Sequence, residues 1–242
     1  MPGGLPTIIL CGGRGTRISD VDPTLPKPML PIGGRPVLWH VMSIYARHGH
    51  RDFVLALGWL GDQIRRWTTE HQEPGWHVTC ADTGRDYLTG TRVKLAARAA
   101  GDGPVMVTYG DGVGDIDVAA LVDFHRSHGR LAPITAVHPP GRFGELVLAG
   151  DQVDVFVEKP QVSNSWINGG FMVFERDAVE SFIPDDDVML EREPIGALAA
   201  AGQLMAYRHE GFWQPMDTPR ERDLLEELWS AGDAPWMVRE DR

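Results

Sequence analysis

The sequence is short of cysteine and contains no long apolar run. Its two cysteines, Cys11 and Cys80, exclude a disulfide scaffold and a CxxC metal site, and they favour a reducing cytoplasm. No stretch reaches the roughly 18 continuous apolar residues that a membrane span needs. The first residues lack a basic start followed by an apolar run, so we expect no signal peptide.

Positive charge is also scarce. Lys and Arg together number 23 against 34 Asp and Glu, so the formal net charge is −11. This balance argues against nonspecific binding to nucleic acid, which depends on Lys and Arg contacts to phosphates. A local basic pocket for a small anion is still compatible with it. The 242 residues, 43% of them hydrophobic, suit one globular domain over 1–242.

Short apolar runs alternate with helical patterns in the first half of the chain. Strands are predicted at 6–11, 52–57, 76–81 and 104–108, and helices at 37–48, 61–68, 91–100 and 117–128. Gly49, Gly101 and Gly129 end three of these helices. Alternation of β and α with short links predicts an α/β fold with a doubly wound, mostly parallel sheet.

The second half changes character. Strands are predicted at 131–138, 145–149, 153–157, 168–174 and 203–207, with a hairpin turn at 150–151 and helices at 190–201 and 218–231. We therefore expect a mixed sheet with a small β-hairpin insertion, and no linker divides the chain.

A glycine-rich segment, Gly12-Gly13-Arg14-Gly15-Thr16-Arg17, follows the first strand. Ligands bind outside the carboxyl ends of strands in open α/β sheets, and glycines let backbone N–H groups approach phosphate oxygens. The spacing matches neither the Rossmann nor the P-loop fingerprint. A phosphate site is favoured over a tight turn with solvated arginines.

Lysine is the rarer cation, with only Lys27, Lys94 and Lys159 among the 23 basic residues. Two of them stand directly before proline, as in Pro26-Lys27-Pro28 and Glu158-Lys159-Pro160. Lysine offers a compact point charge that arginine does not reproduce, and flanking prolines stiffen the backbone at Lys27. Lys27 is thus a candidate for stabilising phosphate charge, while chance survival of a surface lysine stays open.

Two carboxylates are candidate metal ligands. Asp111 lies between glycines just after a predicted strand, and Asp217 precedes the last helix. One carboxylate with phosphates and water often holds Mg²⁺, but each could equally be a turn or N-cap residue, and Thr218 competes for the second cap. Asp115 and Asp117 are interpreted as caps of the helix at 117–128. His125 and His128 are interpreted as packed or solvated.

Taken together, these motifs resemble the sugar-1-phosphate nucleotidyltransferases, and within them the glucose-1-phosphate cytidylyltransferase group. The resemblance runs from about residue 6 to 236. It is carried by Leu10–Arg17, Pro26–Met29, Val37–Met42, Tyr109–Val113, Pro139–Gly144, Ile167–Phe171 and Phe212–Thr218.

The resemblance implies a Rossmann-like fold and Mg²⁺-dependent transfer from CTP to a sugar 1-phosphate, with pyrophosphate released and no covalent enzyme intermediate. Residues 1–130 would mainly bind the nucleotide and 131–242 mainly the sugar phosphate. By the same resemblance Arg17 would contact the departing pyrophosphate, Lys27 would neutralise the α-phosphate, and Asp111 and Asp217 would share the Mg²⁺. A homo-oligomer is also implied.

The remaining site residues follow from the same resemblance. Nucleotide contacts are expected from Leu10, Gly12, Gly13, Arg14, Gly15, Thr16, Arg17, Gly90, Thr91, Tyr109 and Gly110. Sugar-phosphate contacts are expected from Glu158, Lys159, Asn168 and Gly169.

Thr91 stands where those relatives have glycine, and the segment 67–76 is shorter than theirs. A different base or sugar is therefore an alternative within the same chemistry. A non-catalytic nucleotide-binding domain would fit the fold too, but Lys27, Asp111 and Asp217 are all present. A metal-dependent glycosyltransferase leaves Gly12–Arg17 and Lys27 unexplained.

Overall fold

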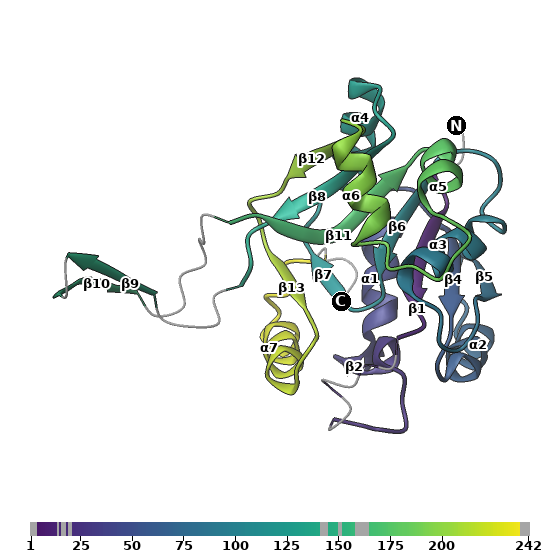
Figure 1. Ribbon diagram of the computed structural model, residues 1–242. Coiled ribbons are helices and arrows are strands. Elements are labelled where there is room, and N and C mark those ends of the chain that lie inside the picture. Colours follow the sequence, from purple (N-terminus) through teal and green to yellow (C-terminus); the bar gives the residue numbers. More distant parts are fainter. Residues whose placement is uncertain are drawn as a thin grey trace.

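A seven-stranded mixed sheet forms the centre of the computed structural model (Figure 1), which describes residues 4–13, 15, 18, 21–140, 145–149, 152–157 and 165–237. The strand order is β12-β8-β11-β6-β1-β4-β5. Neighbouring strands run parallel except where β11 pairs antiparallel with β6 and β8. The predicted doubly wound, mostly parallel sheet is confirmed.

The strands are β1 (Thr7–Cys11), β2 (Pro31–Ile32), β3 (Arg35–Pro36), β4 (Asp52–Leu57), β5 (His77–Asp82), β6 (Val105–Tyr109), β7 (Gly112–Gly114), β8 (Ala132–Val137), β9 (Glu145–Ala149), β10 (Gln152–Val157), β11 (Ile167–Phe174), β12 (Leu204–Arg208) and β13 (Trp213–Pro215). The helices are η1 (Lys27–Met29, 3₁₀), α1 (Val37–Ala46), α2 (Gly61–Glu70), α3 (Thr89–Ala97), α4 (Val118–His128), α5 (Arg176–Phe182), α6 (Glu193–Ala200) and α7 (Pro219–Ser230). Within the described residues, no helix is long and apolar enough to cross a membrane.

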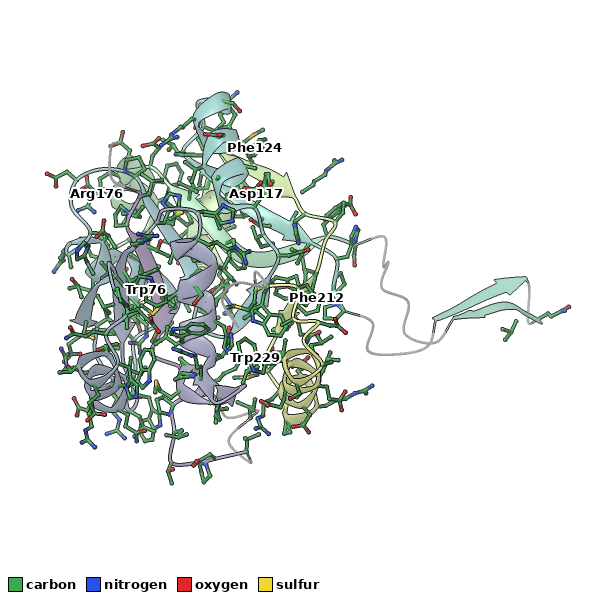
Figure 2. The ribbon with its side chains drawn as sticks, turned by 180° about the vertical axis from the view of Figure 1, so that it is seen from behind. Trp76, Asp117, Phe124, Arg176, Phe212 and Trp229 are labelled. Atoms are coloured by element: carbon green, nitrogen blue, oxygen red, sulfur yellow. The ribbon has the colours of Figure 1, made fainter. Side chains whose placement is uncertain are left out.

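Each face of the sheet is covered by helices because the central strand is apolar on both sides. In β1, Ile9 and Cys11 join the core under α1, while Ile8 and Leu10 join the core under α3. The first core also contains Trp236 from the end of the described chain. Figure 2 shows Trp229 directed from α7 toward α1, where its ring lies 4.9 Å from that of His40.

Several predicted boundaries were wrong. Helix α3 begins at Thr89 rather than 91 and ends at Ala97 rather than 100. Helix α6 begins at Glu193 rather than 190, because proline occupies its first turn while the buried Leu190 donates its N–H to Thr89 Oγ1. Helix α1 ends at Ala46, and Gly49 beyond it has φ +86°.

The structure also contains elements that the sequence patterns did not predict. These are η1 and the β2–β3 pair within the long loop after β1, the β7–β13 pair, and α5. Asp117 caps α4 as expected, its side chain accepting a hydrogen bond from Ala120 N–H at 2.9 Å. Asp115 is not a cap. Its Oδ1 lies 2.9 Å from His209 Nε2 instead.

The predicted β-hairpin insertion is present as β9 and β10, which pair antiparallel. Figure 1 shows this hairpin extending away from the main sheet. Its predicted turn at 150–151 lies outside the described residues. So do five predicted site residues, namely Arg14, Thr16, Arg17, Glu158 and Lys159.

Candidate active site

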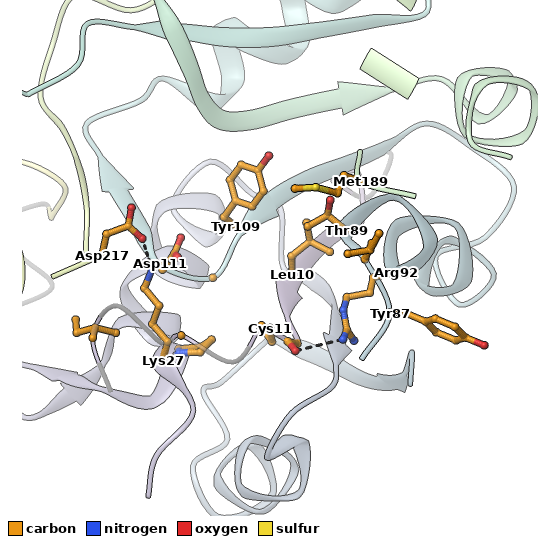
Figure 3. A pocket seen from close by; sticks show the side chains of 17 residues that line it. Leu10, Cys11, Lys27, Tyr87, Thr89, Arg92, Tyr109, Asp111, Met189 and Asp217 are labelled. Carbon is orange, nitrogen blue, oxygen red and sulfur yellow. Dashed lines mark hydrogen bonds and ion pairs between the residues drawn. The ribbon is translucent and has the colours of Figure 1, made fainter. Parts of the chain in front are cut away.

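A pocket of about 420 Å³ opens at the carboxyl ends of β1 and β6. The first of these strands ends at Cys11 and the second at Tyr109, and each is followed by glycine. The pocket (Figure 3) is lined by Leu10, Cys11, Gly12, Gly13, Gly15, Ile18, Lys27, Pro28, Tyr87, Leu88, Thr89, Arg92, Tyr109, Gly110, Asp111, Met189 and Asp217. Open α/β sheets bind ligands at this edge.

Lys27 lies between the two predicted metal ligands. Its Nζ donates to Asp111 Oδ2 and to Asp217 Oδ1, each at 2.5 Å. The Lys27 side chain is only 11% exposed. Burial opposes its charge, but the two carboxylates outweigh burial and raise the pKa of Lys27 above its ordinary value. The ammonium is therefore charged at neutral pH.

Asp111 and Asp217 are 106 positions apart in the sequence, and a short antiparallel pair of strands joins them. In this pair, Gly112 of β7 lies opposite Pro215 of β13. Beyond the ladder, Met216 N–H donates to Asp111 O at 2.9 Å. The two aspartates thus extend from adjacent ends of one ladder.

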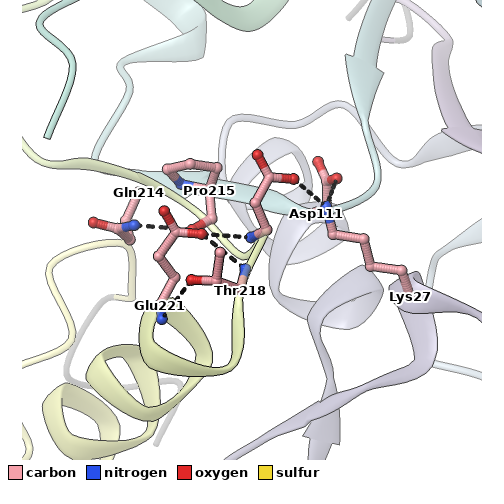
Figure 4. Close-up of polar contacts among 7 residues, drawn as sticks. Lys27, Asp111, Gln214, Pro215, Thr218 and Glu221 are labelled. Carbon is pink, nitrogen blue, oxygen red and sulfur yellow. Dashed lines mark hydrogen bonds and ion pairs between the residues drawn. The ribbon is translucent and has the colours of Figure 1, made fainter. Parts of the chain in front are cut away.

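Thr218, not Asp217, caps α7. Its side chain accepts from Glu221 N–H, and Glu221 accepts from Thr218 N–H in return, which completes a capping box. Glu221 Oε2 also accepts from Asp217 N–H at 2.8 Å (Figure 4). The sequence contained the signal for this role in the Thr-x-x-Glu pattern, but Glu221 was not predicted as a site residue. It fixes the main chain from which Asp217 reaches Lys27.

The donor set fits a small, hard divalent cation. Asp111 and Asp217 offer carboxylate oxygens, and both already hold the positive charge of Lys27. In the part of the chain that the structure describes, no group of three or more His, Cys, Asp or Glu could hold a metal ion. A site with two carboxylates suits Mg²⁺, which keeps waters and takes substrate phosphate oxygens as further ligands.

Glycine is required at several positions of the pocket wall. A Cβ at Gly12 would lie 2.3 Å from the Arg92 guanidinium, and one at Gly110 would lie 3.0 Å from Leu10 O. Gly15 has φ +60°, and a Cβ there would meet Lys27 Cβ at 2.9 Å. The phosphate-loop glycines Gly12 and Gly15 therefore pack directly against the side chains of Arg92 and Lys27, and Gly110 packs against the end of β1.

Arg92 is a pocket residue that the sequence reasoning missed. It is 3% exposed, and its guanidinium donates to Leu57 O, Thr83 Oγ1, Gly84 O, Gly12 O and Arg85 O at 2.8–3.2 Å. It ties the start of the glycine-rich loop to the segment after β5. Burial lowers the pKa of Arg92, yet an arginine keeps its charge in proteins. A buried arginine that bonds to distant carbonyls produces no local sequence pattern from which its role could be predicted.

The remaining described predictions divide into two groups. Leu10, Gly12, Gly13, Gly15, Tyr109 and Gly110 line the pocket, whereas Gly90, Thr91, Asn168 and Gly169 are not among its lining residues. Asn168 lies close by, since its Nδ2 donates to Tyr109 Oη at 3.4 Å. Tyr109 in turn donates to Glu191 Oε1 at 2.5 Å. Burial, and then the Glu191 carboxylate, raises the pKa of Tyr109, so its phenol stays protonated.

The fold and the site define an α/β protein with a charged pocket at the carboxyl edge of its sheet. The family model described as "Nucleotidyl transferase" matches residues 6–214, and the chain belongs to that family. It is an enzyme of the nucleotidyltransferase class.

Named relatives cover nearly the whole chain. The glucose-1-phosphate cytidylyltransferase of Salmonella typhimurium is 43% identical and covers 96% of this chain and 99% of its own. A probable glucose-1-phosphate cytidylyltransferase of Bacillus subtilis is 35% identical over 96% and 98%. Among solved structures, HddC from Yersinia pseudotuberculosis has a TM-score of 0.75 and 23% identity, with 93% and 99% of the two chains covered, and supports the fold.

Proposed function

We propose that this protein transfers the cytidylyl group of CTP to glucose 1-phosphate, which yields CDP-glucose and releases pyrophosphate. The observation that carries the proposal is the meeting of Lys27, Asp111 and Asp217 beside the glycine-lined loop in one pocket. The two relatives at 43% and 35% identity supply the choice of CTP and glucose 1-phosphate.

The reaction is a displacement at phosphorus. An oxygen of the sugar phosphate attacks the α-phosphorus of the nucleotide, and a new P–O bond forms. The bond from the α-phosphorus to the bridging oxygen breaks, and its electron pair leaves on pyrophosphate. No side-chain nucleophile is needed. Cys11 lines the pocket, but burial first, and then Cys80 and Asp111, raise the pKa of its thiol and keep it protonated.

Charge neutralisation and alignment would supply the catalysis. We infer that Asp111 and Asp217 hold Mg²⁺, which would polarise the phosphates when bound. Lys27, attached to the same two carboxylates, is placed to neutralise charge on the α-phosphate. Gly12, Gly13 and Gly15 line the pocket and carry no side chains of their own, so their backbone N–H groups would contact the remaining phosphates.

Other roles rest on the sequence resemblance. Arg14, Thr16 and Arg17 are proposed to complete the phosphate contacts, with Arg17 on pyrophosphate. Glu158, Lys159, Asn168 and Gly169 are proposed to bind the sugar phosphate, and the link from Asn168 to Tyr109 supports a sugar site beside the pocket. A homo-oligomer in the cytoplasm is proposed as the working form, as is the division into a nucleotide half (1–130) and a sugar half (131–242).

Pyrophosphate release tests the proposal directly. The purified protein would be incubated with glucose 1-phosphate and each of CTP, UTP, dTTP, ATP and GTP, with Mg²⁺ and with EDTA. Release with CTP that EDTA abolishes is expected. Asp111→Asn and Asp217→Asn should each lower kcat by on the order of 100-fold or more, because each removes half of the charge that holds the metal.

Asp123→Asn is the matched control. Asp123 lies on the outer face of α4 with its side chain 78% exposed, so its variant should match the wild type. Pyrophosphate release with a different nucleotide would support the reaction but contradict the choice of CTP. No release with any nucleotide, tested also with a panel of other sugar 1-phosphates, would contradict the proposed function.

A further inference from the structure

The wall of the pocket farthest from the carboxylates is built from two segments of the chain. Tyr87 and Leu88 lie just before α3, Thr89 is its first residue, and Met189 comes from the segment between α5 and α6. Figure 3 shows Thr89 and Met189 side by side, with Asp217 and Lys27 at the opposite end of the pocket. This wall exists only while the two segments stay together.

Two threonine hydroxyls accept hydrogen bonds from the backbone on either side of Met189. Val188 N–H donates to Thr91 Oγ1 at 3.1 Å, and Leu190 N–H donates to Thr89 Oγ1 at 2.9 Å. Because Thr89 and Thr91 lie in the same first turn of α3, they hold the backbone N–H groups of the residues before and after Met189. The main chain of Met189 is thus fixed from both sides.

The same hydroxyls also donate. Thr91 Oγ1 donates to Asp187 Oδ1 at 2.9 Å, and Thr89 Oγ1 donates to Glu191 Oε2 at 2.6 Å. Each threonine therefore binds one amide and one carboxylate of the same segment. Asp187 Oδ1 also accepts from Leu88 N–H at 2.9 Å, so it fixes a second wall residue.

Gly90 lets the two segments approach this closely. Its N–H donates to Val188 O at 3.0 Å, and a Cβ at Gly90 would lie 2.9 Å from that oxygen. We call the arrangement of Thr89, Gly90 and Thr91 against residues 187–191 the threonine clamp. It accounts for Gly90 and Thr91, which do not line the pocket themselves.

The chemistry of the two ends of the pocket assigns the ligand groups. Phosphates belong at the end that offers glycine backbone and Lys27, as the proposed function requires. The other end offers Leu10, Leu88, Met189 and the ring of Tyr87 beside the polar groups of Thr89 and Arg92, and a largely apolar surface with a few polar groups suits a flat heterocyclic base. The position of Met189 then sets how wide a base this end accepts.

We propose that the threonine clamp sets the base selectivity of the nucleotide site, with Met189 as the contacting residue and Thr91 as a positioning residue that acts through it. The proposal rests on the proposed function. Thr91 reaches the base only through the backbone of Val188 and Met189. Its loss should therefore weaken discrimination between bases while the phosphate end of the pocket stays intact.

Thr91→Val tests the clamp because valine keeps the shape and removes both hydrogen bonds. We expect KM for CTP to rise about tenfold with kcat changed by less than about threefold, since the effect of one hydrogen-bonding group on binding is of this size. The kcat/KM ratio of CTP to ATP and GTP should fall. Thr91→Ser keeps the hydroxyl and should restore both values. Met189→Ala should also lower the ratio, although it leaves the clamp intact.

A hydrogen-exchange measurement and a control variant test whether the effect of Thr91→Val is local to the clamp. Hydrogen exchange at Val188 and Leu190 should accelerate in Thr91→Val, with exchange in β1 and β6 unchanged. Thr69→Val is the control, because the Thr69 hydroxyl donates within its own helix, to Arg65 O. The clamp proposal is wrong if the wild type is active with CTP and Thr91→Val folds with an unchanged KM for CTP and an unchanged kcat/KM ratio between bases.

A wild type inactive with every nucleotide would instead overturn the proposed function. In that case equilibrium binding of CTP, ATP and GTP to the same variants still tests the clamp, since selectivity in binding needs no turnover. Equal binding selectivity in the wild type, Thr91→Val and Met189→Ala would then contradict it.

Discussion

Lys27 and Arg92 line the same pocket, and each is a buried cation held by a different kind of partner. Lys27 donates to two carboxylates, and these raise its pKa. Arg92 donates to four backbone carbonyls and one hydroxyl, and burial lowers its pKa. All five of these acceptors, which lie in the described part of the chain, are neutral.

The difference separates a charge that acidic groups hold from a charge that neutral groups hold. Lys27 contacts Asp111 and Asp217, the two carboxylates that we propose bind a metal ion, so a metal would compete with it for the same oxygens. Arg92 instead joins the end of β4, the start of the glycine-rich loop and the segment after β5. We therefore propose that Lys27 responds to substrate and metal, whereas Arg92 connects three parts of the chain.

Replacing Lys27 by methionine should give the largest effect. Turnover should fall by on the order of 100-fold or more, because charge on the α-phosphate is no longer neutralised. Affinity of the free protein for Mn²⁺ should rise by on the order of tenfold, because a competing cation that occupies the site most of the time is gone. Electron paramagnetic resonance of Mn²⁺ titrated into both proteins measures the second effect, and Asp111→Asn in the same background should remove it. Unchanged Mn²⁺ affinity would show that Lys27 does not compete with metal.

Arg92→Lys should destabilise the protein by on the order of 3 kcal/mol. A single ammonium cannot span the five acceptors, and buried carbonyls lose their donor. Urea unfolding measures the change. The comparison variant is Arg98→Lys, which replaces the C-cap residue just after α3 and changes no such network in the described structure. Stability within 0.5 kcal/mol of wild type, as an order-of-magnitude limit for a neutral surface change, would show that the network is dispensable.

His40 is a buried histidine whose imidazole is neutral in the folded protein at pH 7. Burial lowers its pKa from 6.5 to about 4, and its Nδ1 accepts from Trp236 Nε1–H at 3.2 Å. In the unfolded chain His40 binds a proton near pH 6.5, whereas in the folded chain it does so only near pH 4. The contribution of neutral His40 to folding stability is therefore complete above pH 6.5 and is lost as the pH falls from 6.5 to 4. The loss is about 3 kcal/mol from this residue. Unfolding at pH 7.5 and 4.5 should therefore show a smaller acid loss in His40→Gln than in wild type, and equal losses would exclude His40 as the cause.

Lys94 should have the smallest effect. Its Nζ binds Ile183 O and Asp185 Oδ1, both at 2.7 Å, but the Asp185 side chain is 96% exposed, and such pairs contribute little. Lys94→Met is expected to shift Tm by no more than about 2 °C. A drop in Tm several times larger, measured by calorimetry, would show that Lys94 has a structural role.

The sequence predicted the sheet because its central strands carry continuous apolar runs that only a doubly covered strand can bury. It likewise indicated Lys27, between two prolines, and Asp111, between two glycines just after β6, since such neighbours are local features. The pocket residues Leu10, Gly12 and Gly13 follow from the local pattern at the end of β1.

What the sequence did not predict depends on contacts between distant segments. The strands β7 and β13 have three residues each, too few for a periodic pattern, and they pair only because the chain returns to the same place. Arg92 and Glu191 look like ordinary helix and loop residues until the fold surrounds them. Thr91 was interpreted as a change beside the base pocket, and only the structure places its hydroxyl on Asp187 and Val188.

The pairing of β7 with β13 has a consequence for synthesis of the protein. Ribosomes make the chain from the N-terminus, so Lys27 and Asp111 emerge long before Asp217. All seven strands of the main sheet are made before Asp217, the second carboxylate that contacts Lys27. The cluster of Lys27, Asp111 and Asp217 is therefore completed only after the sheet that carries it has been synthesised.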